Sequence, residues 1–439
     1  MDFLIKALQL ILSLSILIIL HEFGHYAFAK LFKTRVEKFY LFFDPWFSLF
    51  KFKKGETEYG IGWVPLGGYV KISGMIDESM DKEAMKEEPK PYEFRSKPAY
   101  QRLLIMIGGV LVNILLAFFI FWIMLFYWGE SYVDVKNAKY GLSYHPIANE
   151  IGIQDGDVVT KVGSETVVVP SDILRGILLN ESSSLTVKRG DSTFVVEVSN
   201  AYKQNLIGSK IKAFADYRYP FIIDSVLTGS NASKANLMKG DSLMAINGQT
   251  NAFFNIFQIK ALENKNKALE LMVKRGNDTL NLSCQITENG KIGIINRHYA
   301  KEFKIETKEY GFFEALPAGI GKGISTLTGY VTSLKYLFTK EGAQSVGGFG
   351  AMGSMFPTFW DWHTFWATTA FFSIALAFMN ILPIPALDGG HVLFLLYEII
   401  TRRKPNEQFM EYAQYAGMIL LLGILLFANG NDLFRLFSK

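Results

Sequence analysis

Two histidines, His21 and His25, enclose the stretch His-Glu-Phe-Gly-His, and Glu22 directly follows the first of them. At this spacing on a helix both imidazoles lie on one face and can reach one zinc ion. A glutamate beside the first histidine can accept a proton from a metal-bound water and pass it to a leaving amine. The pattern therefore predicts a Zn²⁺-dependent hydrolase in which Glu22 is the catalytic base.

The residues before this motif are apolar except for two serines over residues 10–20. Ionisable side chains within such a span are energetically unfavourable and indicate a functional site by default. The alternative is a pair of buried histidines that neighbouring helices satisfy by hydrogen bonds. We favour the catalytic interpretation.

A second polar stretch, Asn-Ile-Leu-Pro-Ile-Pro-Ala-Leu-Asp-Gly-Gly-His, occupies residues 380–391 of another apolar segment. Pro383 and Pro385 cannot lie in a regular helix, so the backbone is expected to open there. Open backbone at membrane depth is tolerated where it lines a cavity or meets a substrate. Asp388 can supply the carboxylate that completes a three-ligand zinc site. Spacing alone leaves His391 as the competing ligand.

The composition is typical of a membrane protein, with 50% hydrophobic residues and 37 phenylalanines among 439 residues. The net charge of +4 is small and the basic residues cluster near the apolar spans, which argues against nucleic-acid binding. The single cysteine, Cys284, excludes an intramolecular disulfide. The first apolar run is expected to be retained, because signal-peptide cleavage would discard the metal motif.

Basic residues at both ends of the loop at 31–102 indicate that this loop is cytoplasmic. Both termini, and the segment after the second span, are then extracytoplasmic. Asn113 in the second span is a buried polar group that needs a partner, and we expect it to join two helices.

Residues 57–72 are predicted to form two short strands around a glycine-bearing turn. A β-hairpin can dip into a bilayer only where protein or a water-filled cavity covers its backbone. Its free edge could pair with an extended substrate. An ordinary surface hairpin is the alternative. The glycines that we consider for substrate contact are Gly60, Gly62, Gly67 and Gly68.

From about residue 131 to residue 298 the chain is strand-rich and contains an internal repeat. The stretch at 155–162 recurs at 239–246, and Val-Lys-Arg-Gly at 187–190 recurs at 273–276, about 85 residues later. Each copy resembles a PDZ module in circularly permuted order. Such modules bind a peptide C-terminus as an added strand. The alternative is a pair of modules that only shield the active site.

Residues 312–338 carry apolar side chains at spacings of three and four, which favours a helix lying on the outer membrane surface. The alternative is a helix that packs on the repeated modules.

The metal motif in the first span, the tandem repeat and Asn-x-x-Pro-x-Pro-x-Leu-Asp-Gly-Gly in the third span together resemble the bacterial site-2 proteases, specifically the regulator-of-sigma-E protease group. The resemblance covers essentially the whole chain. One departure is Gly347-Gly348, where many relatives carry Gly-Pro. The resemblance implies that Glu22 is the catalytic base and supports a membrane-dipping hairpin. It also implies zinc ligands at His21, His25 and Asp388, and substrate contacts at Asn380, Pro383 and Pro385.

The function that this resemblance implies is intramembrane proteolysis in the bacterial inner membrane. The expected substrates are single-span proteins in the lipid bilayer: an anti-sigma factor trimmed by a first protease, and remnant signal peptides. Two alternatives remain: a membrane metalloprotease with a cytosolic site, and a catalytically silent PDZ scaffold. The Leu-Asp-Gly-Gly motif argues against the first, and the retained Glu22 and ligands argue against the second.

The expected fold is a polytopic α-helical membrane protein with four transmembrane helices, a membrane-associated β-hairpin and two extracytoplasmic α+β PDZ domains. The expected boundaries are 1–30 for the first span, 31–102 for the cytoplasmic loop, 103–129 for the second span, 130–205 and 206–300 for the PDZ domains, 301–362 for the surface helix and glycine-rich turn, 363–398 for the third span and 411–429 for the fourth.

Overall fold

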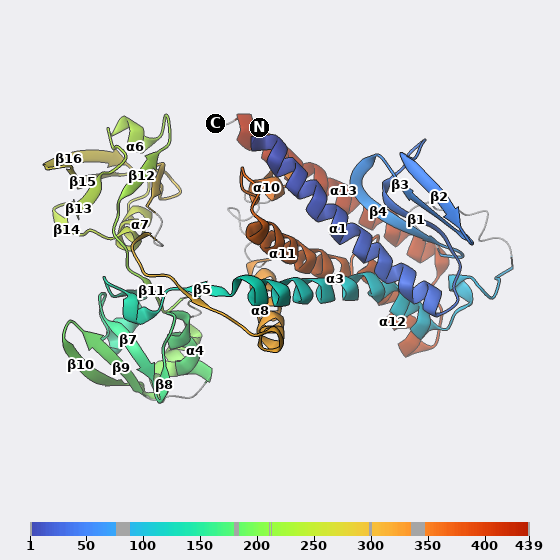
Figure 1. Ribbon diagram of the computed structural model, residues 1–439, viewed down its shortest axis with the longest axis horizontal. Helices are drawn as coiled ribbons and strands as arrows, with labels where there is room; N and C mark the ends of the chain where they lie inside the picture. The colour runs from blue at the N-terminus through green and yellow to red at the C-terminus, as the bar shows by residue number, and fades with distance from the viewer. Residues whose placement is uncertain are drawn as a thin grey trace. The chain divides into compact units, whose positions relative to one another are not determined.

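The computed structural model describes residues 2–75, 88–179, 184–209, 211, 213–297, 301–334 and 347–437 (Figure 1). The chain forms two compact units. The helical unit comprises Met1–Gly129 and Glu309–Lys439, and the strand-rich unit comprises Glu130–Lys308.

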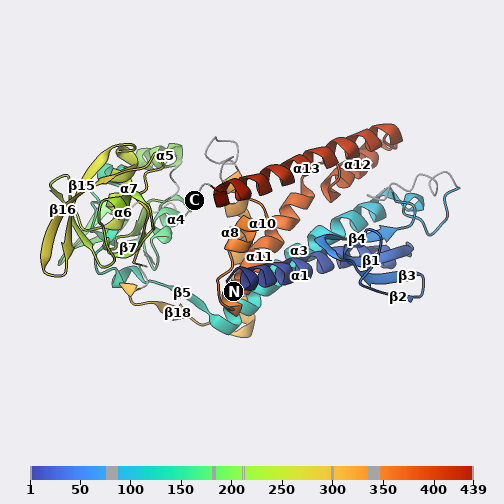
Figure 2. The same ribbon diagram turned by 90° about the horizontal axis from the view of Figure 1, so that it is seen from above.

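Within the described residues, four helices of the helical unit are long and apolar enough to cross a membrane. They are α1 (Asp2–Leu31), α3 (Ala99–Trp128), α11 (Trp362–Ile381) and α13 (Glu407–Phe437). Helix α3 is the centre of this unit, because α1, α8 (Phe312–Leu334), α11 and α12 (Asp388–Thr401) all pack against it. In Figure 2 the long helices α1, α3 and α13 are seen along most of their length. Short helices are η1 (Phe94–Ser96) and α10 (Phe349–Ser354).

The third apolar segment is two helices, not one. Helix α11 ends at Ile381, and α12 begins at Asp388. The intervening residues include Pro383 and Pro385, where the sequence predicted that the backbone opens. Ala386 has a positive φ of 74°, which is unusual for a residue with a Cβ and marks a sharp turn just before α12.

The β-hairpin predicted at 57–72 is wrong in its pairing. The structure has four strands, β1 (Val36–Phe43), β2 (Phe50–Lys54), β3 (Thr57–Ile61) and β4 (Val64–Ile72), in the order β2-β3-β1-β4. Strand β1 lies between the two expected partners, parallel to β3 and antiparallel to β4. The connection between β3 and β4 is short, but both strands pair with β1 and not with each other. Among the described strands, β4 is therefore an edge strand.

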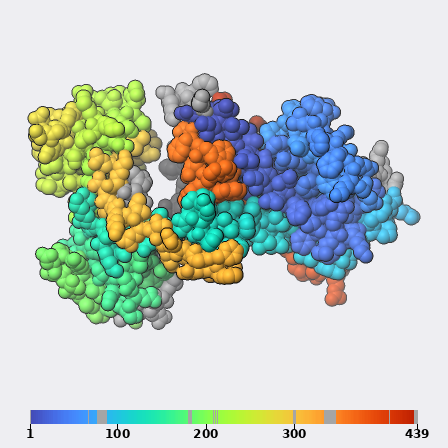
Figure 3. All heavy atoms as spheres, in the orientation of Figure 1, coloured from blue at the N-terminus to red at the C-terminus, as the bar shows by residue number. Residues whose placement is uncertain are grey.

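Helix α8 covers most of the helix predicted at 312–338, and residues 335–338 lie outside the described part of the chain. It packs on α3 through small residues on one face. A Cβ at Gly319 would lie 2.6 Å from the backbone nitrogen of Trp122, and one at Gly323 would meet the ring of Phe118. Small residues allow this close helix crossing. In Figure 3 the two helices lie against each other. Among the described side chains of the predicted apolar stripe, Phe313, Leu316, Ile324 and Val331 stay exposed.

The predicted internal repeat is present in the strand-rich unit as two four-stranded sheets of equivalent order, β10-β9-β7-β8 and β14-β13-β15-β16. Each sheet has a helix after its second strand in sequence, α4 or α7. Each repeat also has a bidentate ion pair between a buried aspartate and an arginine, Asp157 with Arg189 and Asp241 with Arg275. Each repeat has its own apolar core.

The elements of this unit are β5 (Glu130–Tyr132), η2 (Val135–Asn137), β6 (Leu142–Tyr144), η3 (Pro146–Ile151), β7 (Val158–Val162), β8 (Glu165–Thr166), α4 (Ser171–Leu179), β9 (Ser184–Arg189), β10 (Ser192–Glu197), α5 (Asn200–Gly208), β11 (Ala215–Tyr217), β12 (Ile223–Val226), α6 (Asn231–Lys234), β13 (Ser242–Ile246), β14 (Gln249–Thr250), α7 (Phe254–Glu263), β15 (Ala268–Arg275), β16 (Asp278–Gln285), β17 (Ile294–Asn296) and β18 (Glu306–Lys308). The first and last of them, β5 and β18, pair with each other in an antiparallel ladder.

Candidate metal centre

Three side chains from two distant parts of the sequence meet between α1 and the start of α12. Nε2 of His21 lies 3.3 Å from Nε2 of His25 and 3.2 Å from Oδ2 of Asp388. The third separation, between His25 Nε2 and Asp388 Oδ2, is 3.3 Å. The two histidines are buried, and the Asp388 side chain is mostly buried. They are the only group of His, Cys, Asp or Glu side chains with metal-site spacing among the described residues.

The geometry of this triangle fits a tetrahedral zinc ion. Ligand atoms about 2.0 Å from a tetrahedral zinc lie about 3.3 Å from one another. The three observed separations have this value. Moreover, Oδ2 of Asp388 is buried and has no hydrogen-bond partner among the described residues. Buried acceptor atoms that converge on one point need a cation.

Helix geometry brings the three candidate ligands together. His21 and His25 are four residues apart on α1, so their rings share a face of that helix. Asp388 is the first residue of α12. The two glycines after it allow the start of α12 to pack closely on the preceding loop. A Cβ at Gly389 would lie 2.1 Å from the carbonyl oxygen of Leu382, and one at Gly390 would lie 2.7 Å from that of Ile384.

His391, the competing ligand, lies elsewhere. Its Nε2 is 3.2 Å from the side-chain nitrogen of Gln414 on α13, and it does not join the group formed by His21, His25 and Asp388. Asp388 and His391 both belong to α12, but only Asp388 lies within reach of the two histidines.

The remaining residues of the second polar stretch surround the metal centre. Asn380 Nδ2 lies 3.3 Å from Nε2 of His21, so this amide borders the metal position. Pro383 and Pro385 form the loop between α11 and α12. Helix α13 approaches this loop so closely that a Cβ at Gly417 would overlap the carbonyl oxygen of Pro385.

Of the four glycines considered for substrate contact, only Gly68 lies close to the catalytic motif. A Cβ there would lie 2.6 Å from Cγ2 of Ile18 and 3.4 Å from Cγ of Glu22. A Cβ at Gly60 or Gly67 would meet the ring of Tyr40 or Phe43, and one at Gly62 the backbone of Phe43. The absence of side chains at these three positions is thus needed for packing on β1, whereas Gly68 lets edge strand β4 approach α1 beside Glu22.

Sequence reasoning missed the contribution of α3 to this centre. The carbonyl oxygen of Ile105 is 2.8 Å from Nδ1 of His25, and Nδ2 of Asn113 is 3.3 Å from Nδ1 of His21. Between them, a Cβ at Gly109 would lie 2.6 Å from both rings. Asn113 was expected to join helices, and the signal that could have placed it here was its position four residues after Gly109 in an otherwise apolar span.

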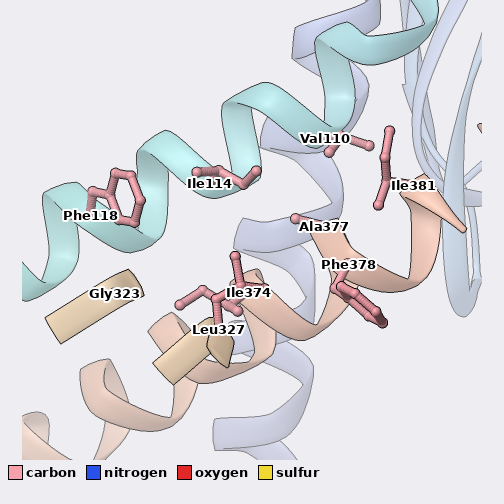
Figure 4. Close-up of a pocket in the computed structure, with 9 residues that line it drawn as sticks. All are labelled: Val110, Ile114, Phe118, Gly323, Leu327, Ile374, Ala377, Phe378 and Ile381. Atoms are coloured by element: carbon pink, nitrogen blue, oxygen red, sulfur yellow. The ribbon is translucent and has the colours of Figure 1, made fainter. Parts of the chain in front are cut away.

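A separate apolar pocket lies between α3, α8 and α11 (Figure 4). Val110, Ile114 and Phe118 line it from α3, and Ile374 and Phe378 line it from α11. It has no titratable side chain in its wall, so it cannot perform the hydrolytic chemistry.

Four helices that are apolar enough to cross a membrane, together with a His-His-Asp triangle of metal-site spacing, are features of a membrane-bound metalloenzyme. The sequence model of Peptidase family M50 matches residues 9–424, and the chain belongs to this family. It is similar to the regulator of sigma-E protease RseP of Escherichia coli K12, with 29% identity over 468 residues that cover 99% of this chain and 100% of the relative.

Two further relatives are similar over the whole length. The regulator of sigma E protease of Haemophilus influenzae is 28% identical over 465 residues, covering 99% of this chain and 100% of the relative. A chain from Rickettsia conorii, named as a candidate zinc metalloprotease, is 28% identical over 430 residues, covering 98% of each chain. The protein is thus a zinc-dependent metalloprotease.

Proposed function

We propose that this protein is an intramembrane endopeptidase of the bacterial inner membrane that hydrolyses peptide bonds within the transmembrane segments of single-span proteins. The observation that carries the proposal is the triangle of His21, His25 and Asp388 on helices that are apolar enough to span a bilayer. A protease that acted only on soluble substrates would not need its ligands on such helices.

Each residue of the centre has a distinct role in this proposal. His21, His25 and Asp388 hold Zn²⁺, which when bound polarises the scissile carbonyl and acidifies a water. Glu22 accepts the proton of that water and delivers it to the leaving amine. Asn380, beside His21, donates a hydrogen bond to the substrate backbone. Pro383 and Pro385 keep the backbone before Asp388 open, so that the substrate can approach the centre.

Edge strand β4 supports the substrate class. A peptide bond in a helical segment is shielded by its own hydrogen bonds, so a transmembrane substrate has to unwind before hydrolysis. The unwound segment then needs new hydrogen-bond partners. Strand β4 pairs only with β1 among the described strands, and Gly68 brings it next to Glu22. A substrate strand added to β4 would satisfy its backbone beside the catalytic base.

The natural substrates that we propose are an anti-sigma factor already trimmed by a first protease, and remnant signal peptides. The names of the relatives from Escherichia coli and Haemophilus influenzae describe them as regulators of sigma-E, which supports a role in envelope-stress signalling. The strand-rich unit is proposed to be a tandem PDZ pair on the outer side of the membrane, with the loop at 31–102 in the cytoplasm and both termini outside.

The variant Glu22→Gln tests the function. In proteoliposomes with a single-span reporter, the variant should retain zinc and lose about 100- to 10,000-fold of the cleavage rate, because an amide cannot accept the proton. Cleavage by the wild type at bonds within the reporter's span is the positive result. A wild type that contains zinc but leaves every single-span reporter intact would support the catalytically silent scaffold.

A further inference from the structure

One face of α3 is shaped around the two histidines. Ile105, Gly109 and Asn113 are spaced by four residues and therefore follow one another along the same side of this helix. The first offers a carbonyl oxygen to His25, the second leaves room for both rings, and the third presents an amide to His21. Each histidine thus meets a polar group of α3 through its Nδ1 atom.

The ring nitrogen that faces α3 determines which nitrogen faces the metal. A neutral imidazole carries one proton, and a nitrogen that binds a metal cannot carry it. In both histidines Nε2 belongs to the ligand triangle, so with the metal bound the proton must be on Nδ1. His25 has a suitable acceptor for this proton in the carbonyl of Ile105, at 2.8 Å.

His21 needs an equivalent acceptor, and Asn113 can provide it. Asn113 is fully buried, and its Oδ1 has no hydrogen-bond partner among the residues that the structure describes. Its Nδ2 lies 3.3 Å from Nδ1 of His21. A half-turn of the amide exchanges its oxygen and nitrogen, which places Oδ1 where it accepts the Nδ1 proton. In that orientation the imidazole and the amide oxygen are both satisfied.

We propose that Asn113 is a positioning residue for His21, whose amide oxygen fixes the proton on Nδ1 and so presents Nε2 to zinc. The proposal rests on the ligand roles given above for His21 and His25. Such partners of metal-bound histidines hold the ring orientation and raise the basicity of the ligand. The two histidines would be held differently, His25 by backbone and His21 by a side chain. Only the second contact can be removed by a simple substitution.

The position of Asn113 is itself fixed by a neighbouring helix. The hydroxyl of Ser373 on α11 donates to the backbone carbonyl of Asn113 over 2.7 Å. Both groups are buried. This bond ties α3 to α11 at the level of the centre, so the amide is held in place by its own backbone and needs only to rotate.

The test measures zinc affinity of the full-length protein in detergent by competition with a chromophoric chelator, without any proteolysis assay. Asn113→Leu keeps most of the side-chain volume and removes the acceptor, and it should weaken zinc binding about 10- to 100-fold. Asn113→Asp retains an oxygen in the same place and should bind zinc at least as tightly as the wild type. The visible spectrum of the Co²⁺ form should show the same tetrahedral site in Asn113→Asp as in the wild type.

Thr369→Val is the matched control, because it removes a different buried polar group, a hydroxyl 2.9 Å from Ser13 Oγ, and should leave zinc affinity unchanged. Unchanged affinity in Asn113→Leu, or equal losses in Asn113→Leu and Asn113→Asp, would overturn the proposal. If Asn113→Leu does not fold, Asn113→Asp decides: wild-type or tighter binding supports the role, and weaker binding refutes it. A wild type that binds no zinc would instead refute the ligand assignment on which the proposal rests.

Discussion

Gly109 is the residue at which the metal centre tolerates no side chain. An added methyl group would lie 2.6 Å from Cε1 of His21 and from Nε2 of His25, well inside van der Waals contact. We expect Gly109→Ala to displace both rings and to weaken zinc binding about tenfold or more. Leu111→Ala, at an exposed position of the same helix, is the control and should bind zinc normally. Chelator competition on the purified variants measures both, and normal affinity in Gly109→Ala would refute the packing argument.

The zinc content of two alanine variants shows whether Asp388 or His391 is the third ligand. Asp388→Ala should leave two ligands, so the purified variant should contain much less than one zinc per chain and no measurable activity. His391→Ala should keep its zinc, because His391 contacts Gln414 and not the triangle. Elemental analysis of both variants provides the measurement. The reverse result would transfer the ligand role to His391.

The sequence predicted a residue of the metal centre only where that residue belongs to a recognisable local motif. The spacing of His21 and His25 follows from helix geometry, and Asp388 follows from the motif around it. The choice between Asp388 and His391 needed the positions of both side chains in space, which their spacing on one helix does not give. Asn113 was expected to join two helices and does contact α1, but its partner there, His21, could not be predicted because it is 92 residues away in sequence.

At the scale of elements, the contact between β4 and α1 leaves no room for a side chain at Gly68. In Gly68→Ala the new methyl group would meet Ile18 Cγ2 at 2.6 Å and the carbonyl of Tyr40 at 2.8 Å. Because the carbonyl is part of the β1 backbone and cannot rotate aside, β4 has to shift relative to both β1 and α1. A displacement of about 1 Å can lower a rate about 100-fold. We expect that loss in reporter cleavage, with zinc content unchanged.

The control for this prediction is Gly423→Ala on α13, where an added Cβ has no atom within 4 Å. It should cleave the reporter like the wild type. If Gly68→Ala also does so, the proposed pairing of substrate with β4 beside Glu22 loses its support.

The four-stranded sheet shows why the pairing of strands was harder to predict than their positions in the sequence. The strands at 57–61 and 64–72 are close to the predicted segment, and the glycines between them suggested a direct turn. Their true partner, β1, lies about 20 to 30 residues earlier, and its four aromatic residues were not considered. Pairing between distant strands depends on the packing of the whole sheet on α1, which local pattern does not contain.

At the scale of the whole molecule, the single cysteine makes the topology measurable. Cys284 is buried, and burial raises the pKa of its thiol to about 11, so little reactive thiolate forms at pH 7.5. A cysteine introduced at Glu88, in the part of the predicted cytoplasmic loop that the structure describes, should resist an impermeant maleimide added to intact cells. A cysteine at Lys234 should react. Opposite labelling would place the strand-rich unit in the cytoplasm.

The role of the strand-rich unit can be tested by deletion. Strands β5 and β18 pair with Tyr132 opposite Glu306, so residues 133–305 can be replaced by a two-residue Asn-Gly turn that closes a hairpin. If the unit excludes bulky substrates, as we favour, the shortened protein should cleave a reporter that still carries its outer domain. If the unit captures the trimmed C-terminus instead, even trimmed reporters should be cut more slowly.

The paired ends of this unit also bear on how such a protein can evolve. Because its entry and exit strands are neighbours, the unit occupies one surface position in the chain of the helical unit, as an inserted domain does. A recombination event could add, remove or exchange it as a single segment without altering the spacing of α1, α3, α11 and α12. The helical unit and the strand-rich unit are therefore free to diverge at different rates.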